Sequence, residues 1–244
     1  MNEPDPHWYR TRLMPLCRFL RRYHRARAID VDCLPREGPA LILGTHAPMS
    51  YDALLGISFI HEHTERIVRG LIHDMWFQIP GVGDFFRNPG MEPASPSAAE
   101  QVLLRGDMIG VLPGGAREAY RSRAERYQLR WEGRYGFARL AIRTGAPIYI
   151  GACPAADLAM DMMLAGLSRA LDRRYRILLP FPRGIGLLPV ARPVKLTFLY
   201  EGPIDPGPRE HEPTSRRVEA LHALTQARML RLIERGIELD DLPR

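Results

Sequence analysis

The chain has 244 residues and a formal net charge of +6, and 45% of its residues are hydrophobic, which is ordinary for a globular protein and allows one domain with a sizeable core. No apolar run approaches the roughly 20 residues of a membrane-spanning helix, and the polar start lacks the apolar core of a secretory signal. The three cysteines lie far apart in the sequence, which argues against a zinc site or a disulfide framework and fits a reducing cytoplasm.

Residues 7–27 are basic and predict an amphipathic helix. Apolar side chains recur at helical spacing from Tyr9 to Tyr23, while arginines crowd the other face. Two interpretations are open: the helix lies on an anionic membrane with its aromatic residues at headgroup level, or it docks on the domain with its arginines in solvent. One helix can do both. Residues 1–29 are therefore distinguished from a domain that spans residues 30–244.

Residues 39–52 have the features of a buried strand, a sharp turn and a helix. Residues 39–44 form an apolar run, Gly44 permits a tight bend, and Pro48 disfavours helix just before it. A helix is expected from about Ser50. His46 therefore lies on a strand-to-helix loop, where functional groups are exposed on a rigid base.

Asp52 follows His46 after five intervening residues. On one continuous helix the two positions would not share a face, but a loop that folds back at Pro48 brings the imidazole and the carboxylate together. A carboxylate on one ring nitrogen would fix the tautomer and leave the other nitrogen as a base. The alternative is that Asp52 is only a first-turn acid facing the positive end of the helix, with Ser50 as its N-cap.

Further elements are expected before residue 108. Residues 65–70 predict a short strand, and residues 97–105 predict a helix that ends at Gly106. His61 and His63 invite a metal interpretation, but no further cluster of ligands joins them, so no metal site is expected.

A second stretch, residues 108–119, repeats the order of strand and turn. Residues 108–112 indicate a buried strand, and the glycines that follow expose backbone N–H groups, which suit an oxyanion or a phosphate. An arginine just beyond can add a bidentate phosphate contact. The alternative is an ordinary connecting turn with a solvated arginine. The candidate substrate-binding residues are Gly114, Gly115, Arg117 and Glu118.

The rest of the chain predicts a charged excursion and then more helices and strands. Residues 120–134 are strongly charged and are expected to be exposed. The expected elements after them are a helix at 136–144 ended by Gly145, a strand at 147–152, an amphipathic Met-rich segment at 155–173, an apolar Pro-rich loop at 180–193, a strand at 194–200, a linker at 201–213 and a helix at 215–235 that stops at Gly236.

The two stretches together resemble the glycerolipid acyltransferase family, which includes the PlsC-like lysophosphatidic acid and glycerol-3-phosphate acyltransferases. That family carries a His–Asp block after its first core strand and a second block, usually Phe-Pro-Glu-Gly-Thr-Arg-Ser, after a later strand. Pro113, Gly115 and Arg117 match the second block, whereas Gly114 replaces the usual Glu. The resemblance covers residues 30–206.

The form of both blocks is similar to one branch of that family. The commonest form has four residues between His and Asp, whereas this chain has five. Five residues together with a Pro-Gly-Gly-x-x-Glu block resemble the branch that includes the diacylglycerol acyltransferases. In the family the region of residues 72–86 helps to build the acyl pocket; ordinary core packing is the alternative.

The resemblance implies an α/β fold with a single domain, in which helices flank a mostly parallel central sheet as in the glycerol-phosphate acyltransferases. It implies an O-acyltransferase that moves a fatty acyl group from acyl-CoA or acyl carrier protein to a hydroxyl of a lysophospholipid or related glycerolipid. His46 would be the base and Asp52 its partner, without a covalent acyl-enzyme, a metal or a further cofactor.

Three alternatives stay open: an acceptor that is a neutral lipid alcohol such as a mono- or diacylglycerol, a thioester or lipid hydrolase that uses the same dyad, and a non-catalytic lipid-binding protein. The implied partners are the acyl donor, the glycerolipid acceptor and an anionic membrane surface, and not nucleic acid. The expected location is cytoplasmic and peripheral on the membrane, without a transmembrane helix.

Overall fold

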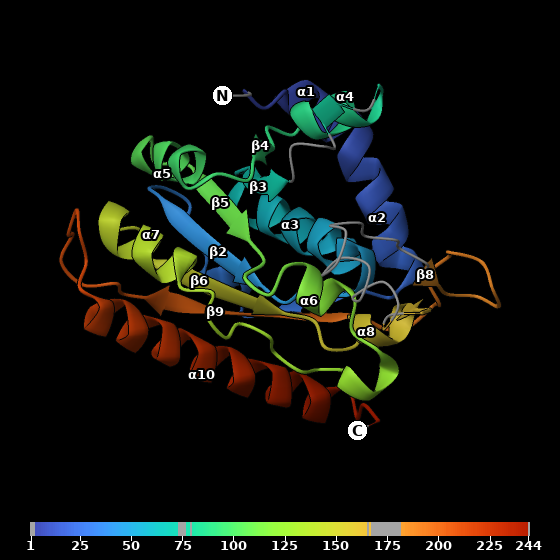
Figure 1. The fold of residues 1–244 in the computed structure, drawn as a ribbon. Coiled ribbons are helices and arrows are strands. Elements are labelled where there is room, and N and C mark those ends of the chain that lie inside the picture. The colour runs from blue at the N-terminus through green and yellow to red at the C-terminus, as the bar shows by residue number, and fades with distance from the viewer. Residues whose placement is uncertain (1–2, 73–76, 79, 165, 167–181, 244) are drawn as a thin grey trace.

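The computed structural model describes residues 3–72, 77–78, 80–164, 166 and 182–243, with the side chains of Met49, Ala116 and Arg117 left out. Within this part of the chain the main sheet has seven strands in the order β1-β9-β6-β2-β5-β3-β4 (Figure 1). Their bounds are β1 (Arg27–Ile29), β2 (Ala40–Gly44), β3 (Val68–Ile72), β4 (Glu92–Pro93), β5 (Met108–Val111), β6 (Ile148–Ala152) and β9 (Thr197–Ile204). A separate pair joins β7 (Asp161–Met162) to β8 (Pro182–Arg183).

The centre of the sheet is parallel. Strand β2 pairs in parallel with β5 on one side and β6 on the other, and β3 continues the parallel order with β5 and β4. Only β9 runs against β6 among the described strands of this sheet, with β1 parallel to β9. This confirms the predicted single α/β domain with a mostly parallel sheet. The carboxyl ends of β2, β5 and β6 consequently meet at one edge, where ligands bind in open α/β sheets.

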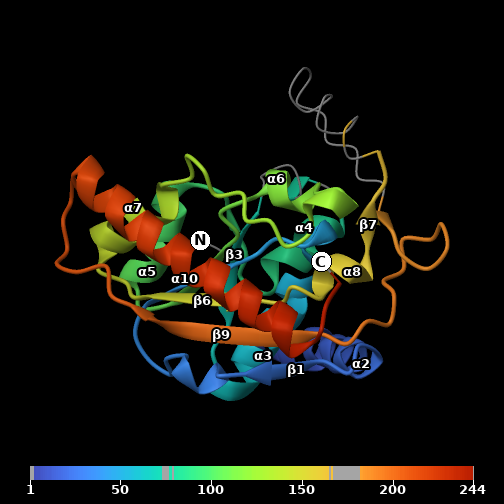
Figure 2. The same cartoon turned by 90° about the horizontal axis from the view of Figure 1, so that it is seen from below.

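Helices cover both faces of the sheet (Figure 2). Because side chains alternate along a strand, Leu41 and Leu43 of β2 pack on one side, whereas Ala40 and Ile42 pack on the other. The first side is covered by α5 (Pro96–Leu104), α7 (Gly136–Thr144) and α10 (Ser215–Leu239), and the second by α3 (Tyr51–Thr64).

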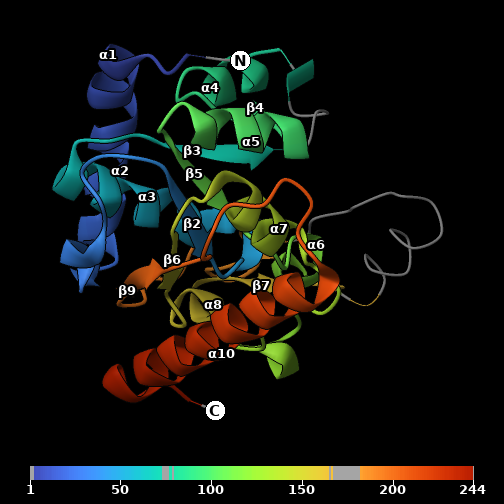
Figure 3. The same cartoon turned by 90° about the vertical axis from the view of Figure 1, so that its left-hand side faces the viewer.

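The N-terminal helix is docked on the domain, beside α3 (Figure 3). It runs from α1 (Pro6–Trp8) through a π-helical turn (Tyr9–Leu13) into α2 (Met14–Tyr23). Its inner face buries Tyr9, Leu13, Met14 and Cys17 in a small cluster of their own. On its outer face Leu16 is 43% and Phe19 66% exposed. Docking is thus one confirmed role of this helix, and contact with a membrane stays a prediction.

Several predicted elements are confirmed with their ends. Helix α7 ends at Gly145, whose φ of +69° places it in the left-handed region that favours glycine. Helix α5 and strands β3, β5 and β6 lie within three residues of their predicted bounds. In the aromatic segment before α5, helix α4 (Val82–Arg87) is described, and Phe85 packs on Trp8 with 5.6 Å between ring centroids. The acyl-pocket prediction for residues 72–86 lies partly outside the described residues.

Two predictions near the C-terminus were wrong. Strand β9 continues to Ile204, through residues predicted as a linker, because Glu201 and Ile204 pair with β6. Gly202 lies against Tyr149 of that strand, where a Cβ would be 2.4 Å from Cδ1. Helix α10 does not stop at Gly236 but continues to Leu239. A Cβ on Gly236 would lie 2.9 Å from Pro154 Cδ, so this glycine permits close packing rather than ending the helix.

The predicted Met-rich segment and the apolar loop are only partly described. The first begins with α8 (Ala156–Ala159) and β7, and its remainder lies outside the described residues. In the second, residues 184–190 follow β8 and expose four apolar side chains, namely Ile185 (46%), Leu187 (77%), Leu188 (62%) and Val190 (49%). Among the described helices we find none with the length and apolar character needed to cross a bilayer.

Candidate active site

The loops that follow β2, β5 and β6 converge at the carboxyl edge of the sheet. His46 follows β2, Glu118 lies in α6 (Ala116–Ala119) after β5, and Asp157 lies in α8 after β6. The parallel order of these three strands therefore brings together residues that are up to 111 positions apart in the sequence. The two predicted motif stretches meet here.

Glu118 joins the two stretches directly. Its carboxylate is fully buried, and its Oε2 accepts a hydrogen bond from the backbone N–H of His46 at 3.0 Å. Its Oε1 accepts the backbone N–H of Arg130 at 2.8 Å. Burial raises the pKa of Glu118, and these two amide contacts oppose the shift. Both carboxylate oxygens are thus committed to backbone amides, so the geometry gives Glu118 a positioning role; the predicted substrate contact stays a prediction.

Gly114 is required by the position of Glu118. A Cβ built on Gly114 would lie 2.0 Å from Cδ of Glu118, well inside contact distance. The carboxyl group of Glu118 thus fills the space that any side chain at position 114 would enter. This explains physically why position 114 carries no Glu in this chain.

Arg121 binds the backbone of His46 from the other side, at its carbonyl oxygen. Its side chain is 5% exposed; Nη2 donates to the carbonyl oxygen of His46 at 3.2 Å and to Asp157 Oδ1 at 2.7 Å. Its Nη1 donates to the Gln128 carbonyl at 2.6 Å. His46 is therefore held at its N–H by Glu118 and at its C=O by Arg121, while its side chain takes no part in either contact.

The His46 ring is oriented for work as a base. Nδ1 lies 3.0 Å from the carbonyl oxygen of Ala47, which can only accept, so Nδ1 carries the proton and Nε2 keeps its lone pair. Ser50 Oγ lies 3.1 Å from Nε2. Burial lowers the pKa of His46; the Ala47 contact raises it and the Arg121 charge lowers it further. The imidazole is consequently neutral at pH 7 and can accept a proton at Nε2.

Asp52 lies in the first turn of α3 and is 4% exposed. Burial and the nearby carboxylate of Asp157 raise the pKa of Asp52 and Arg121 opposes them, so that the pKa lies at about 7. Its Oδ1 is buried and has no hydrogen-bond partner among the described residues. The tautomer of His46 is set by Ala47 rather than by this carboxylate, and the predicted contact between Asp52 and the imidazole stays a prediction.

The turn after β5 has the predicted form. Gly115 has φ of +52° and donates its N–H to the Leu112 carbonyl at 3.0 Å. Arg117 lies in α6, and its side chain is outside the described residues, so its phosphate contact stays a prediction. Within the described part of the chain no group of three or more potential metal ligands occurs.

Sequence reasoning missed Asp157, the contact of Arg121 with the His46 carbonyl and the contact of the Ser50 side chain with the His46 ring. The prediction that residues 120–134 are an exposed excursion was only partly right, since Arg123 and residues 132–134 are exposed, whereas Arg121 and Leu129 are buried and Trp131 is fully so. Ser50 occupies the N-cap position of α3 but makes no capping hydrogen bond with its side chain. Asp157 could have been found from its place after a third central strand at the same edge.

Comparisons with known proteins agree with this architecture. The model of the family described as Acyltransferase matches residues 25–152, just over half of the chain. The crystal structure of the 1-acyl-sn-glycerophosphate acyltransferase PlsC from Thermotoga maritima aligns with a TM-score of 0.61 over 93% of this chain and 81% of that chain, at 13% identity. At that identity the likeness shows the fold alone.

Proteins that match in sequence have a higher identity to this chain than that crystal structure does. An uncharacterised protein of Mycobacterium tuberculosis is 32% identical over 205 residues, which are 80% of this chain and 57% of that protein. The bovine "DGAT1/2-independent enzyme synthesizing storage lipids" is 30% identical over 126 residues, 52% of this chain and 37% of that enzyme. The chain thus spans little more than half the length of the mycobacterial relative. On the matched family model, this chain belongs to the glycerolipid acyltransferase family.

Proposed function

We propose that the protein transfers a fatty acyl group from an acyl thioester, carried by CoA or acyl carrier protein, to a hydroxyl of a lysophospholipid or related glycerolipid. The observation that carries the proposal is the clamp on His46. Its backbone is fixed by Glu118 and Arg121, and its Nε2 lone pair is left to accept a proton. A base held in this way fits an acyl transfer in which the acceptor hydroxyl is the nucleophile.

The reaction follows from that geometry. Nε2 of His46 takes the proton of the acceptor hydroxyl as its oxygen bonds to the thioester carbonyl carbon. The tetrahedral intermediate then breaks its C–S bond, and the departing thiolate takes the proton from the imidazolium. The products are a lipid ester and a free thiol, and Asp52 stabilises the imidazolium in between.

The negative oxygen of the tetrahedral intermediate needs N–H donors near His46. The glycine turn after β5 is the candidate, because Glu118 ties it to the backbone of His46. Since the Gly115 amide already donates to Leu112, we assign the oxyanion contact to the Gly114 amide.

A neutral lipid alcohol is the second candidate acceptor. It is favoured by the replacement of the family's Glu at position 114 and by the names of the bovine enzyme and of a phytyl ester synthase from Arabidopsis thaliana, which is 30% identical over 139 residues, 52% of this chain and 20% of that protein. These names describe the relatives and not this chain. The arginine-rich surroundings of the site favour a phosphorylated acceptor instead.

Thiol release tests the proposed reaction. The purified protein is incubated with acyl-CoA, with and without candidate lipid acceptors, and both the thiol and the lipid ester are measured. We expect thiol release that depends on the acceptor and matches the ester formed. Release without an acceptor would mean a hydrolase, and lipid binding without release would mean a non-catalytic protein.

The pH dependence of kcat/KM tests the role of Asp52. Because Asp52 must be ionised to stabilise the imidazolium and its pKa is about 7, activity should rise with pH through about 7. Asp52→Asn should lower activity severely and remove this rise, leaving only a dependence below pH 6.5 from His46. A rise through pH 7 that persists in Asp52→Asn would contradict the assignment.

The melting temperature provides the control for Asp52→Asn, because this substitution is expected to raise stability while it lowers activity. The pKa of Asp52 is higher in the folded protein than the ordinary 3.8, so its ionisation opposes folding above about pH 7 and has no effect well below 3.8. Asp52→Asn should therefore raise the melting temperature at pH 8 while it lowers activity. A variant that is less stable at pH 8 would mean that its low activity reflects damage to the fold.

We also propose that the protein binds a membrane through two neighbouring apolar surfaces. The outer face of α2 exposes Phe19, and residues 184–190 expose Leu187 and three more apolar side chains. The two lie close together, because Tyr23 of α2 donates to the Ala191 carbonyl at 2.8 Å.

Vesicle flotation tests the membrane proposal. Binding should strengthen with anionic lipid and weaken in salt, since exposed charges are screened over about 10 Å at 0.1 M. Leu187→Asp should reduce flotation strongly, whereas Leu224→Asp, at a position 49% exposed on α10, should not. Equal loss in both variants, or binding that ignores salt and lipid charge, would contradict the proposal.

A further inference from the structure

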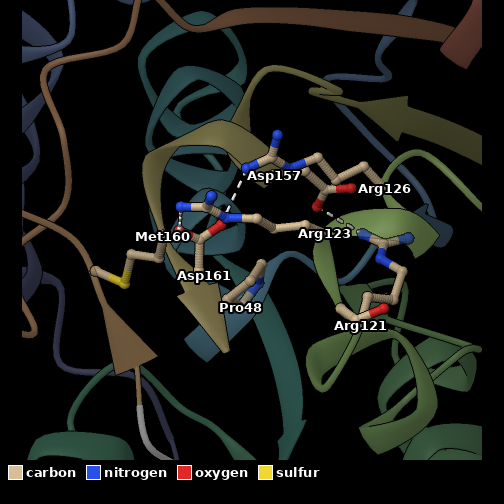
Figure 4. A pocket seen from close by; sticks show the side chains of 8 residues that line it. Pro48, Arg121, Arg123, Arg126, Asp157, Met160 and Asp161 are labelled. Carbon is tan, nitrogen blue, oxygen red and sulfur yellow. Dashed lines mark hydrogen bonds and ion pairs between the residues drawn. The ribbon is translucent and has the colours of Figure 1, made fainter. Parts of the chain in front are cut away.

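A cluster of arginines surrounds two aspartates beside the His46 loop (Figure 4). Arg121, Arg123 and Arg126 come from the loop after α6, Arg183 from β8, and Arg192 from beyond the exposed apolar segment. Five guanidinium groups thus face the carboxylates of Asp157 and Asp161. The cluster keeps an excess of positive charge after its own ion pairs are made.

Asp161 is the centre of the cluster and is only 7% exposed. Its Oδ2 accepts hydrogen bonds from Arg123 and Arg192, both at 2.6 Å, and its Oδ1 accepts one from Arg126 at 2.9 Å. Burial acts to raise the pKa of Asp161, but the Arg123 and Arg192 contacts outweigh it and hold the pKa well below its usual range. This carboxylate is therefore ionised at every physiological pH and cannot balance all of the arginines around it.

Within the described part of the chain, three donors in the cluster have no acceptor. The Nε atoms of Arg121, Arg126 and Arg183 are buried without a hydrogen-bond partner. A buried charged donor without an acceptor is costly, and in a native protein it marks a place where an ion or a water completes the hydrogen bonds. Two of the three donors, those of Arg121 and Arg126, belong to residues that line one pocket, which indicates that an anion completes the cluster there.

The pocket adjoins the catalytic loop. Its lining includes Pro48, two residues after His46, and Arg121, which also holds the His46 carbonyl. Its enclosed part measures about 10 Å³, which is room for about one oxygen-sized group. The Arg123 side chain at the pocket is 60% exposed, so further oxygens of the same anion can be held outside.

The apolar segment of residues 184–190 connects to the same cluster. Arg183 precedes it and Arg192 follows it, and both reach Asp161. The chain between them folds back on itself, with the Gly184 N–H donating to the Leu188 carbonyl at 2.7 Å. The exposed apolar segment is therefore flanked by two arginines of the cluster. This arrangement fits a ligand with an acyl chain and an anionic group.

We propose that this arginine pocket binds a phosphate group carried by one of the two substrates and so positions that substrate beside His46. Guanidinium groups match phosphate oxygens in bidentate geometry, and the pocket offers several of them from independent segments. The proposal rests on the proposed acyl transfer, and it concerns residues outside both motif stretches. The phosphate can belong to a lysophospholipid acceptor or to the CoA of the donor.

Direct binding to the full chain tests the pocket without relying on turnover. Calorimetry is run with lysophosphatidic acid, with monoacylglycerol of the same acyl chain, and with CoA. Arg123→Gln should weaken binding of a phosphate-bearing ligand about ten- to hundredfold, with Arg123→Lys in between, and leave monoacylglycerol unchanged. Arg216→Gln, exposed at the start of α10 on the side of the molecule away from α8 (Figure 1), serves as the control and should bind all three ligands as wild type does.

The comparison of lysophosphatidic acid with CoA identifies which substrate carries the phosphate. Loss with lysophosphatidic acid assigns the pocket to the acceptor, and loss with CoA assigns it to the donor. Wild-type affinity for both in Arg123→Gln and in Arg192→Gln, or an equal loss of monoacylglycerol, would overturn the proposal. Because binding is measured apart from turnover, a wild-type protein that binds phosphate in this pocket without transferring acyl groups would refute the proposed function and not the pocket.

Discussion

His46→Ala is expected to reduce acyl transfer by about 10²- to 10⁴-fold, the usual loss when a general base is removed. The fold should survive, because Glu118 and Arg121 hold the backbone of residue 46 rather than its ring. Alanine keeps both of those contacts. Steady-state rates of ester formation, with saturating acyl-CoA and acceptor, measure the effect.

Two controls make this result specific. His211→Ala removes an exposed imidazole and should leave the rate unchanged. The urea unfolding midpoint of His46→Ala should stay close to that of wild type. A folded His46→Ala protein that transfers acyl groups at the wild-type rate would refute the role of His46 as base.

Glu118→Ala should damage both stability and activity. It leaves the part-buried amides of His46 and Arg130 without their acceptor, at a combined cost of about 2–5 kcal/mol in the free energy of unfolding. Glu118→Gln keeps the shape but turns an NH₂ group toward one of those N–H donors, so it should cost less and still lower kcat. Urea unfolding and rates of ester formation measure the two effects, with the exposed Glu219→Gln on α10 as control.

The contact of Glu118 with Gly114 allows a sharper version of this test. Gly114→Ala should be strongly destabilising alone, because its Cβ would lie 2.0 Å from Glu118 Cδ. In a Glu118→Ala background that clash is gone, so the second substitution should cost much less. Additive losses in the double variant, or an unchanged rate in Glu118→Gln, would mean that Glu118 does not shape the loop of His46.

Much of the site could be predicted from the sequence because its parts are local. A buried strand, a glycine or proline turn and a polar residue just beyond it recur at His46 and at Glu118. Parallel strands then place such turns at one edge. What the sequence could not supply was the role of each group: nothing local shows that Glu118 turns inward to the His46 amide or that Ala47 fixes the ring tautomer.

The arginine-rich loop shows where local reasoning fails. A run of charges ordinarily predicts a solvated surface, yet Arg121 is buried because Asp157 neutralises it from a helix 36 positions away. Asp161 likewise pairs with Arg126, whose side chain is 25% exposed, and with Arg123, which remains 60% exposed. The partners of a buried charge lie on other elements, so composition alone gave the wrong environment.

Glycine was misread near the C-terminus for a related reason. Gly236 was expected to end a helix, and Gly202 lies in residues 201–213, which were predicted as a linker; helix ends and loops are the usual local settings of glycine. In the structure both glycines permit close approach, to Pro154 and to Tyr149 respectively. That requirement depends on tertiary packing, so a single sequence cannot distinguish it from a turn.

The central claim is that the acyl group passes directly from the thioester to the lipid, with His46 as base. Ser50 offers the rival route, since its Oγ lies 3.1 Å from Nε2 and such a pair can form an acyl-enzyme. The deciding measurement is a single-turnover reaction of excess enzyme with labelled acyl-CoA and acceptor, quenched at intervals and analysed for label on protein and on lipid. We predict label on lipid alone, in wild type and in Ser50→Ala; label on Ser50 that forms before the lipid ester and is lost as the ester appears would contradict direct transfer.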